Sequence, residues 1–163
     1  MKRKVLWIED SARGENVALT APVALSGRYD LTVAVNATVG LTELVQSEFD
    51  AIIVDIRIVP GNDPRWIDEY SNRGASEKAA RLGLRLLEVV LGTAGPRWQH
   101  EKIKDSARRP AKYGVLTVEA KESLSSHLDR LGITAYRNKH AAASKRLLLE
   151  LIDEVIQNVE RSR

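Results

Sequence analysis

The sequence predicts an open α/β domain in which a parallel sheet is covered by helices on both faces. Two observations indicate this fold class. Short apolar runs alternate with amphipathic, helix-length segments through most of the 163 residues, which is the rhythm of a doubly wound sheet. The run from Ala51 to Val54 is apolar without polar alternation, which is typical of a strand buried on both faces.

Local signals set the expected boundaries. Ser11 and Asn36 are suitable N-caps, and Gly27 and Gly132 are suitable helix stops. Pro22 should kink or shorten the first helix because proline has no amide hydrogen. Five strands that alternate with five helices predict a flavodoxin-like sheet with the strand order 2-1-3-4-5. The predicted strands are 5–8, 31–35, 51–54, 114–117 and 133–137, and the predicted helices are 11–26, 37–47, 79–91, 119–130 and 141–159.

Composition limits the class of protein. A chain of 163 residues fits one domain with a sizeable core. The absence of cysteine excludes disulfides and cysteine-based metal sites. No apolar stretch approaches the roughly 20 residues of a membrane span, and the apolar run after the basic N-terminus is too short for a signal peptide. We therefore expect a cytoplasmic protein without a membrane partner.

Two segments interrupt the alternation of strands and helices. The first, at about 60–78, is rich in turn formers, and we predict a long loop without regular structure. The loop leaves the sheet just after Asp55, so it should gate access to that residue, with Trp66 as its anchor. The second segment, at about 93–112, follows a helix that runs back to the opposite edge of the sheet. We therefore expect the two insertions at different ends of the molecule.

The basic character of the chain belongs to its middle. Residues 60–112 contain eleven lysines and arginines against seven acidic residues. We expect a positive surface that binds an acidic partner. Nucleic acid is a weaker alternative, because the segment has no helix-turn-helix or stacking signature. The residues expected on this surface are Arg97, Lys102, Lys104, Arg108 and Arg109.

Polar side chains stand at the ends of four predicted strands. They are Glu9 and Asp10 after the first strand, Asp55 after the third, Thr117 on the fourth and Lys139 just past the fifth. In a sheet of order 2-1-3-4-5 these ends are neighbours, and ligands of open α/β sheets bind at this edge. Clustered carboxylates repel one another unless a hard cation lies among them. The sequence therefore indicates a Mg²⁺ site.

This set of residues resembles the receiver domain of two-component response regulators. The resemblance extends from Lys4 to about Val159, and it implies that 1–163 is a single receiver domain with two insertions. It implies that Asp55 is the phosphoacceptor and that Thr117 and Lys139 contact the phosphoryl oxygens. It also implies a switch formed by Thr117 and Tyr136, and Mg²⁺ bound by Glu9, Asp10, Asp55 and the backbone carbonyl of Arg57.

The resemblance further implies a function and partners. A histidine kinase or phosphotransfer protein would phosphorylate Asp55, and the changed surface would bind a downstream effector. The protein would not be an enzyme beyond self-catalysed phosphoryl transfer and dephosphorylation. We expect a stand-alone receiver without an output domain. Leu147 and Leu149 extend the apolar surface of the last helix, which predicts a homodimer.

Several residues depart from the family pattern and keep alternatives open. His140 follows Lys139 where the family usually has proline, and Val118 stands where a smaller residue is usual. Arg57 and Glu119 could pair over the site and slow phosphoryl entry or hydrolysis. These features favour an alternative, a phosphorylation-independent pseudo-receiver that acts as a protein-interaction module. A Mg²⁺-dependent phosphohydrolase is weaker still, because no second acid lies two residues after Asp55.

Overall fold

The computed structural model of the protein contains a five-stranded parallel sheet with the order β2-β1-β3-β4-β5. The structure describes residues 1–14, 16–72, 80–140 and 144–163. The predicted fold class and strand order are confirmed. The strands are β1 (Arg3–Ile8), β2 (Tyr29–Ala34), β3 (Ala51–Val54), β4 (Tyr113–Thr117) and β5 (Ala135–Asn138).

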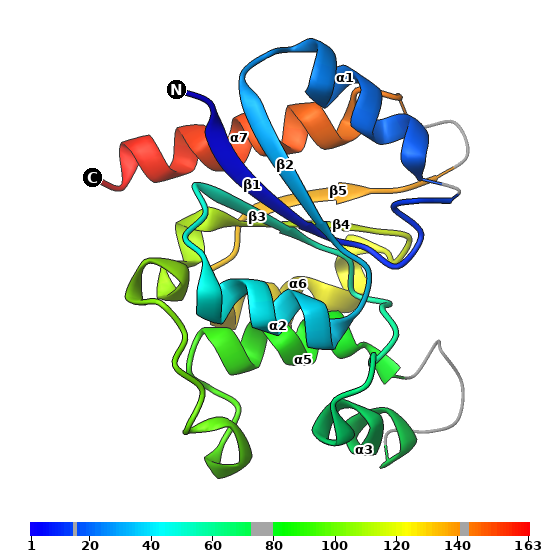
Figure 1. Ribbon diagram of the computed structural model, residues 1–163, viewed down its shortest axis with the longest axis vertical. Helices are drawn as coiled ribbons and strands as arrows, with labels where there is room; N and C mark the ends of the chain where they lie inside the picture. The colour runs from blue at the N-terminus through cyan, green and yellow to red at the C-terminus, as the bar shows by residue number, and fades with distance from the viewer. Residues whose placement is uncertain (15, 73–79, 141–143) are drawn as a thin grey trace.

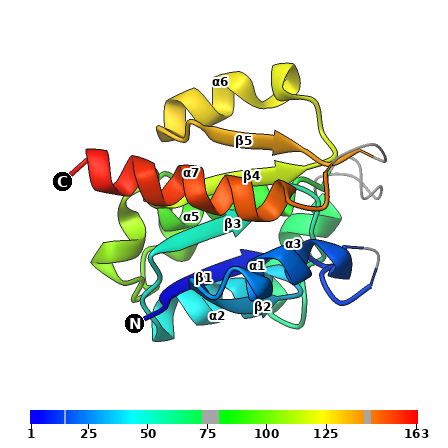
Figure 2. The same ribbon diagram turned by 90° about the horizontal axis from the view of Figure 1, so that it is seen from above.

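Helices cover both faces of the sheet. Figure 1 shows α1 and α7 on one face and α2, α5 and α6 on the other, and Figure 2 looks onto the face with α1 and α7. The helices are α1 (Thr20–Leu25), α2 (Ala37–Gln46), α3 (Pro64–Asn72), α5 (Leu82–Val90), α6 (Lys121–Leu131) and α7 (Leu147–Arg161). Short 3-10 turns lie at Val17–Leu19, Pro96–Trp98, Asp105–Arg108 and Pro110–Lys112.

The two helical layers explain why the central strands read as unbroken apolar runs. Val5 and Trp7 of β1 belong to the apolar cluster that includes residues of α7, whereas Leu6 and Ile8 belong to the cluster on the opposite face. Since both faces are covered, side chains on both sides of the strand leave water on folding. All four of these side chains are fully buried.

The first helix is shorter than predicted. Residues 10–14 form turns, and the helical segment begins only with the 3-10 turn at Val17–Leu19. Ser11 caps no helix: its hydroxyl donates to Asp10 Oδ1 at 3.2 Å, and its amide donates to Glu9 Oε1 at 3.1 Å. Pro22 is the third residue of α1, where its missing amide hydrogen removes no intrahelical bond. The proline therefore marks the first turn of this helix and not its middle.

The other predicted boundaries are close to the observed ones. Asn36 caps α2, since its side-chain oxygen accepts a hydrogen bond from Val39 N at 2.8 Å. Gly132 ends α6 in the left-handed conformation, with φ of 75°. The predicted starts of the third and last helices, at Ala79 and Ala141, lie outside the described residues.

The first insertion contains a helix where the sequence predicted an irregular loop. Asp63 caps α3 with its carboxylate, which accepts a hydrogen bond from Arg65 N at 2.9 Å. Pro64 begins the helix, in a position that suits proline because no intrahelical amide bond is needed there. Trp66 is fully buried, so its predicted role as an anchor is confirmed. The helix packs against α5, beyond the helical layer in Figure 1.

The two insertions contact each other, so the prediction that they lie at different ends is wrong. The ring centroids of Trp66 and Trp98 are 4.2 Å apart. The Arg65 guanidinium lies over the Trp98 ring and also pairs with Glu101. The second insertion folds back beneath α5 before it returns to the start of β4, which brings residues 96–101 to α3.

The start of α7 is buried against its own chain. Leu147 and Leu149 belong to the same apolar cluster as Trp7 and Ile53. Both leucines are therefore unavailable to a partner subunit, and they give no support to the predicted homodimer. The homodimer itself stays a prediction.

Candidate functional site

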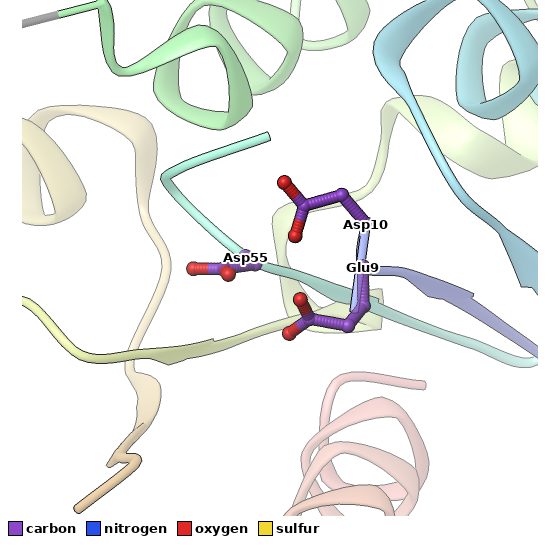
Figure 3. A group of neighbouring side chains, drawn as sticks. All are labelled: Glu9, Asp10 and Asp55. Atoms are coloured by element: carbon purple, nitrogen blue, oxygen red, sulfur yellow. The ribbon is translucent and has the colours of Figure 1, made fainter. Parts of the chain in front are cut away.

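Strand pairing brings the predicted carboxylates together. Ile8 pairs with Val54 in the parallel register of β1 and β3, and Asp55 N donates to Ile8 O at 3.0 Å. Glu9 and Asp55 therefore leave neighbouring strands at the same level, with Asp10 one residue further (Figure 3). One carboxylate oxygen from each of the three residues lies within 4.8 Å of the others. The predicted acidic cluster is present.

Lys139 joins two of these carboxylates. Its backbone amide donates to Thr117 O at 2.7 Å, which extends the pairing of β5 with β4 by one residue. Its ammonium group lies 2.9 Å from Asp55 Oδ2 and also bonds to Glu9 Oε2. The lysine therefore occupies the predicted place although His140 follows it. Its single positive charge is shared between two buried acids.

Burial controls the electrostatics of the site. Glu9 and Asp55 are buried, whereas Asp10 is exposed. Burial, followed by the charge of Asp55, raises the pKa of Glu9 to about 8, against the opposing effect of Lys139. Burial lowers the pKa of Lys139, but the charges of Asp55 and Glu9 outweigh that effect and raise the pKa above its ordinary value. Lys139 is therefore a permanent cation at neutral pH.

The acidic cluster fits a hard divalent cation. Three carboxylates contribute closely spaced oxygen atoms, which are the ligands that Mg²⁺ prefers. Asp10 has an exposed side chain, which suits an ion that keeps part of its water shell. Arg57 N donates to Asp55 Oδ1 at 3.3 Å, so the backbone after β3 turns back toward the carboxylate. The role of the Arg57 carbonyl as a ligand stays a prediction.

Comparison with known proteins gives a match only at the level of structure. No protein-family model matches the sequence, and no curated protein is similar to it. A CheY-like response regulator receiver domain protein from Methanospirillum hungatei JF-1 is 20% identical, with a TM-score of 0.63 and 100% of both chains covered. The receiver domain of the Francisella response regulator 1452 is 20% identical, with a TM-score of 0.59 over 99% of this chain and 100% of that one.

A third solved structure shares the fold. The receiver domain of a sensor histidine kinase from Pseudomonas aeruginosa PAO1 has a magnesium ion coordinated in its active site cleft. It is 18% identical to this chain, with a TM-score of 0.55, and the match covers 96% of this chain and 99% of that one. The chain has the receiver-domain fold. The expected doubly wound sheet and the expected resemblance are thus confirmed at the level of fold.

Within the receiver fold, the two predicted switch residues lie on neighbouring strands, with Thr117 at the end of β4 and Tyr136 in β5. Thr117 is buried, and its hydroxyl accepts a hydrogen bond from Glu119 N at 3.4 Å. The Tyr136 hydroxyl donates to the backbone carbonyl of Glu119. Asn138, which the sequence did not single out, donates to the same carbonyl at 3.1 Å. Residues of β5 therefore hold the segment that follows Thr117.

An open pocket of about 630 Å³ surrounds Asp55 in this receiver fold. It is wider than the acidic cluster, because the turns after β1 and the start of α7 form one of its sides. Arg57, Val118 and His140 were expected near Asp55 from the sequence, but the residues of these two segments could not be identified, since no motif links them. The additional lining residues are Ser11, Asn16, Ala18, Leu19, Arg57, Val118, His140, Lys145 and Leu147.

The first insertion does not cover the pocket with its described residues. None of the residues 59–72 lines it, and α3 packs against α5. The rest of the predicted lid, residues 73–79, lies outside the described residues. Gating by this loop stays a prediction. Among the residues that the structure describes, no helix has the length and apolar character needed to cross a bilayer.

Basic side chains of the second insertion are partly engaged within the chain. Arg97 pairs with Asp68 at 2.7 Å, and Arg108 donates to the Val90 carbonyl at 3.3 Å. Lys102 and Lys104 are exposed. Arg97 and Arg108 are exposed as well. A positive surface that binds an acidic partner stays a prediction.

Proposed function

We propose that the protein is a response regulator receiver that accepts a phosphoryl group on Asp55 from a histidine kinase or phosphotransfer protein. The observation that supports this proposal is the ammonium group of Lys139 at 2.9 Å from Asp55, at the strand edge that also carries Glu9 and Asp10. Phosphoryl transfer needs mainly a positioned nucleophile and positive charge near the phosphoryl oxygens. These groups are gathered in one pocket of a receiver fold.

The proposed reaction follows from the groups around Asp55. A carboxylate oxygen of Asp55 attacks the phosphorus of a phosphohistidine, and a phosphorus–oxygen bond forms as the phosphorus–nitrogen bond breaks. The electron pair of the broken bond stays on the imidazole of the donor. Lys139 then faces the phosphoryl group with its positive charge. A Mg²⁺ ion held by Glu9, Asp10, Asp55 and the Arg57 carbonyl would supply further positive charge beside the same oxygens.

Signalling belongs to the same proposal. Phosphorylation adds negative charge to a pocket that is bordered by the segment after Thr117. This change would alter the surface offered to a downstream effector. The reaction requires no enzymatic activity beyond self-catalysed phosphoryl transfer and dephosphorylation. A cytoplasmic location and a homodimer are part of the proposal.

The direct test is Mg²⁺-dependent modification by acetyl phosphate, followed by intact mass. We expect the wild type to gain the mass of one phosphoryl group, and we expect Asp55→Asn to gain none because the amide is no nucleophile. Asp50→Asn is a matched control, since Asp50 lies at the other end of β3. A modified Asp55→Asn protein would place the nucleophile elsewhere.

Lys139→Met should slow this reaction roughly 100-fold, because a preorganised charge beside developing negative charge contributes that much in enzymes. The rate of mass gain with acetyl phosphate measures the effect. Lys121→Met, on the exposed side of α6, controls for the loss of a lysine. An unchanged rate in Lys139→Met would show that the lysine has only a structural role between Glu9 and Asp55.

A second candidate function is a pseudo-receiver that binds proteins without phosphorylation. The observation that favours it is the Lys139 ammonium, which already pairs with both Glu9 and Asp55. Val118, which was expected from the sequence to narrow the approach to Asp55, is half exposed and lines the same pocket. A wild-type protein that gains no phosphoryl group from any donor would favour this candidate.

A further inference from the structure

Glu119 is a buried carboxylate that is shared by two arginines. Its side chain is 3% exposed. Arg57 Nε donates to Oε1 at 3.0 Å, and Arg81 Nε lies 3.0 Å from Oε2. The two arginine side chains are about one third exposed. Both cations therefore reach the carboxylate from the surface, and each could leave it without passing through the core.

The two arginines come from different segments, Arg57 from the turn after β3 and Arg81 from the start of α5. Arg57 follows Asp55 by two residues, lines the pocket around it, and bonds to its carboxylate through the backbone amide. Arg81 stands at the N-cap of α5 with φ of 24°, a backbone conformation that is unfavourable for residues other than glycine. Arg81 does not line the pocket.

Because Glu119 pairs with two arginines, one of them can leave without exposing the carboxylate to the loss of all its cations. A buried carboxylate that loses its only cation is strongly destabilised, because the charge stays in a poorly solvated place. Glu119 would keep Arg81 if Arg57 moved away. A phosphoryl group on Asp55 carries nearly two negative charges and three acceptor oxygens, so it competes well with a carboxylate for a guanidinium.

We propose that Arg57 transfers from Glu119 to the phosphoryl group on Asp55, and that Arg81 makes this transfer possible by retaining Glu119. The inference rests on the proposed function. It assigns Arg57 a direct contact with the phosphoryl oxygens. Arg81 is a positioning residue that acts through Glu119. The Arg57–Glu119 pair foreseen from the sequence is then the resting state of a mobile cation, and it blocks phosphoryl entry only until the exchange.

The proposal predicts whether each substitution strengthens or weakens the binding of a phosphoryl group. Without Arg57, the phosphoryl group loses a cation. Without Arg81, Glu119 depends on Arg57 alone and holds it more firmly, so phosphoryl binding weakens although Arg81 touches no phosphoryl oxygen. Without the charge of Glu119, Arg57 is free and binding strengthens. Once that charge is absent, Arg81 no longer matters.

The experiment measures the affinity of beryllofluoride with Mg²⁺ by calorimetry, since this probe forms no permanent bond. Arg57→Gln should weaken binding roughly tenfold, the value of one charge-assisted hydrogen bond. Arg81→Gln should weaken it roughly threefold, a typical indirect coupling between neighbours. Glu119→Gln should strengthen it, and the double variant Arg81→Gln with Glu119→Gln should match Glu119→Gln alone. Arg81→Lys should restore most of the wild-type affinity.

Controls separate this inference from the proposed function. Arg97→Gln removes a surface arginine that pairs with Asp68, and it should leave affinity unchanged. Circular dichroism without the probe checks that each variant is folded. A wild type that binds no beryllofluoride refutes the proposed function. If the wild type binds beryllofluoride, two results would refute only the transfer of Arg57 and leave the proposed function standing. The first is an Arg57→Gln variant with unchanged affinity. The second is an Arg81→Gln substitution that weakens binding by the same factor whether or not Glu119 is replaced.

Discussion

Gly83→Ala is expected to destabilise the protein by about 4 kcal/mol or more, at the upper end of single substitutions. A Cβ atom at position 83 would lie 1.8 Å from the Asp55 carbonyl oxygen and 2.7 Å from its carbonyl carbon. Both atoms are backbone, so a side-chain rotation cannot relieve the overlap. The gain of up to about 1 kcal/mol from alanine inside a helix is much smaller.

Urea unfolding followed by circular dichroism measures this effect. Gly14→Ala is the matched control, because a Cβ there would meet only the Ser11 carbonyl oxygen at 3.9 Å. The control should change the free energy of unfolding by less than about 0.5 kcal/mol. If Gly83→Ala were equally harmless, α5 could shift away from the segment after β3, and the position of Asp55 would not depend on this close approach.

Trp66→Ala is expected to cost about 3–5 kcal/mol, the usual range for a buried tryptophan. The side chain is fully buried and stacks on Trp98, so its removal leaves a cavity at the contact between the two insertions. Trp98 would lose its aromatic partner at the same time. The free energy of unfolding, from urea titration, measures the loss.

The neighbouring residue offers a matched control for this tryptophan. Ile67 lies on the same helix but is 43% exposed, so Ile67→Ala should cost far less than Trp66→Ala. Comparable effects of the two substitutions would mean that α3 contributes through its helical structure alone. A small effect of both would mean that the first insertion is peripheral to the stability of the domain.

The acidic cluster could be predicted because it depends on few steps. Apolar runs fix the strands, and parallel strands end at one edge, so Glu9, Asp10 and Asp55 had to meet there. The same logic placed Thr117 and Lys139. The contact between Arg57 and Glu119 also followed, since each residue lies two positions past a neighbouring strand end.

Other features depend on packing between segments that carry no shared pattern. The contact of Trp66 with Trp98 joins two insertions without periodicity, and nothing in the sequence pairs them. Helix α3 had a local signal in Asp63 and Pro64. These residues were interpreted as turn formers, but they are equally typical of a helix start. Leu147 and Leu149 were correctly identified as apolar, but the sequence could not show that their own chain covers them.

The hydrogen bonds at the start of α5 limit how this site can recognise an anion. Free amides at a helix N-terminus often bind phosphate, because they and the helix dipole both favour negative charge. Here the Gly83 amide donates to the Ile56 carbonyl at 3.0 Å, and the amides of Leu84 and Arg85 donate to the Arg81 carbonyl. These backbone donors next to Asp55 are already engaged. Neutralisation of a phosphoryl group by the protein therefore falls to long cationic side chains, which can change partners in a way that a helix dipole cannot.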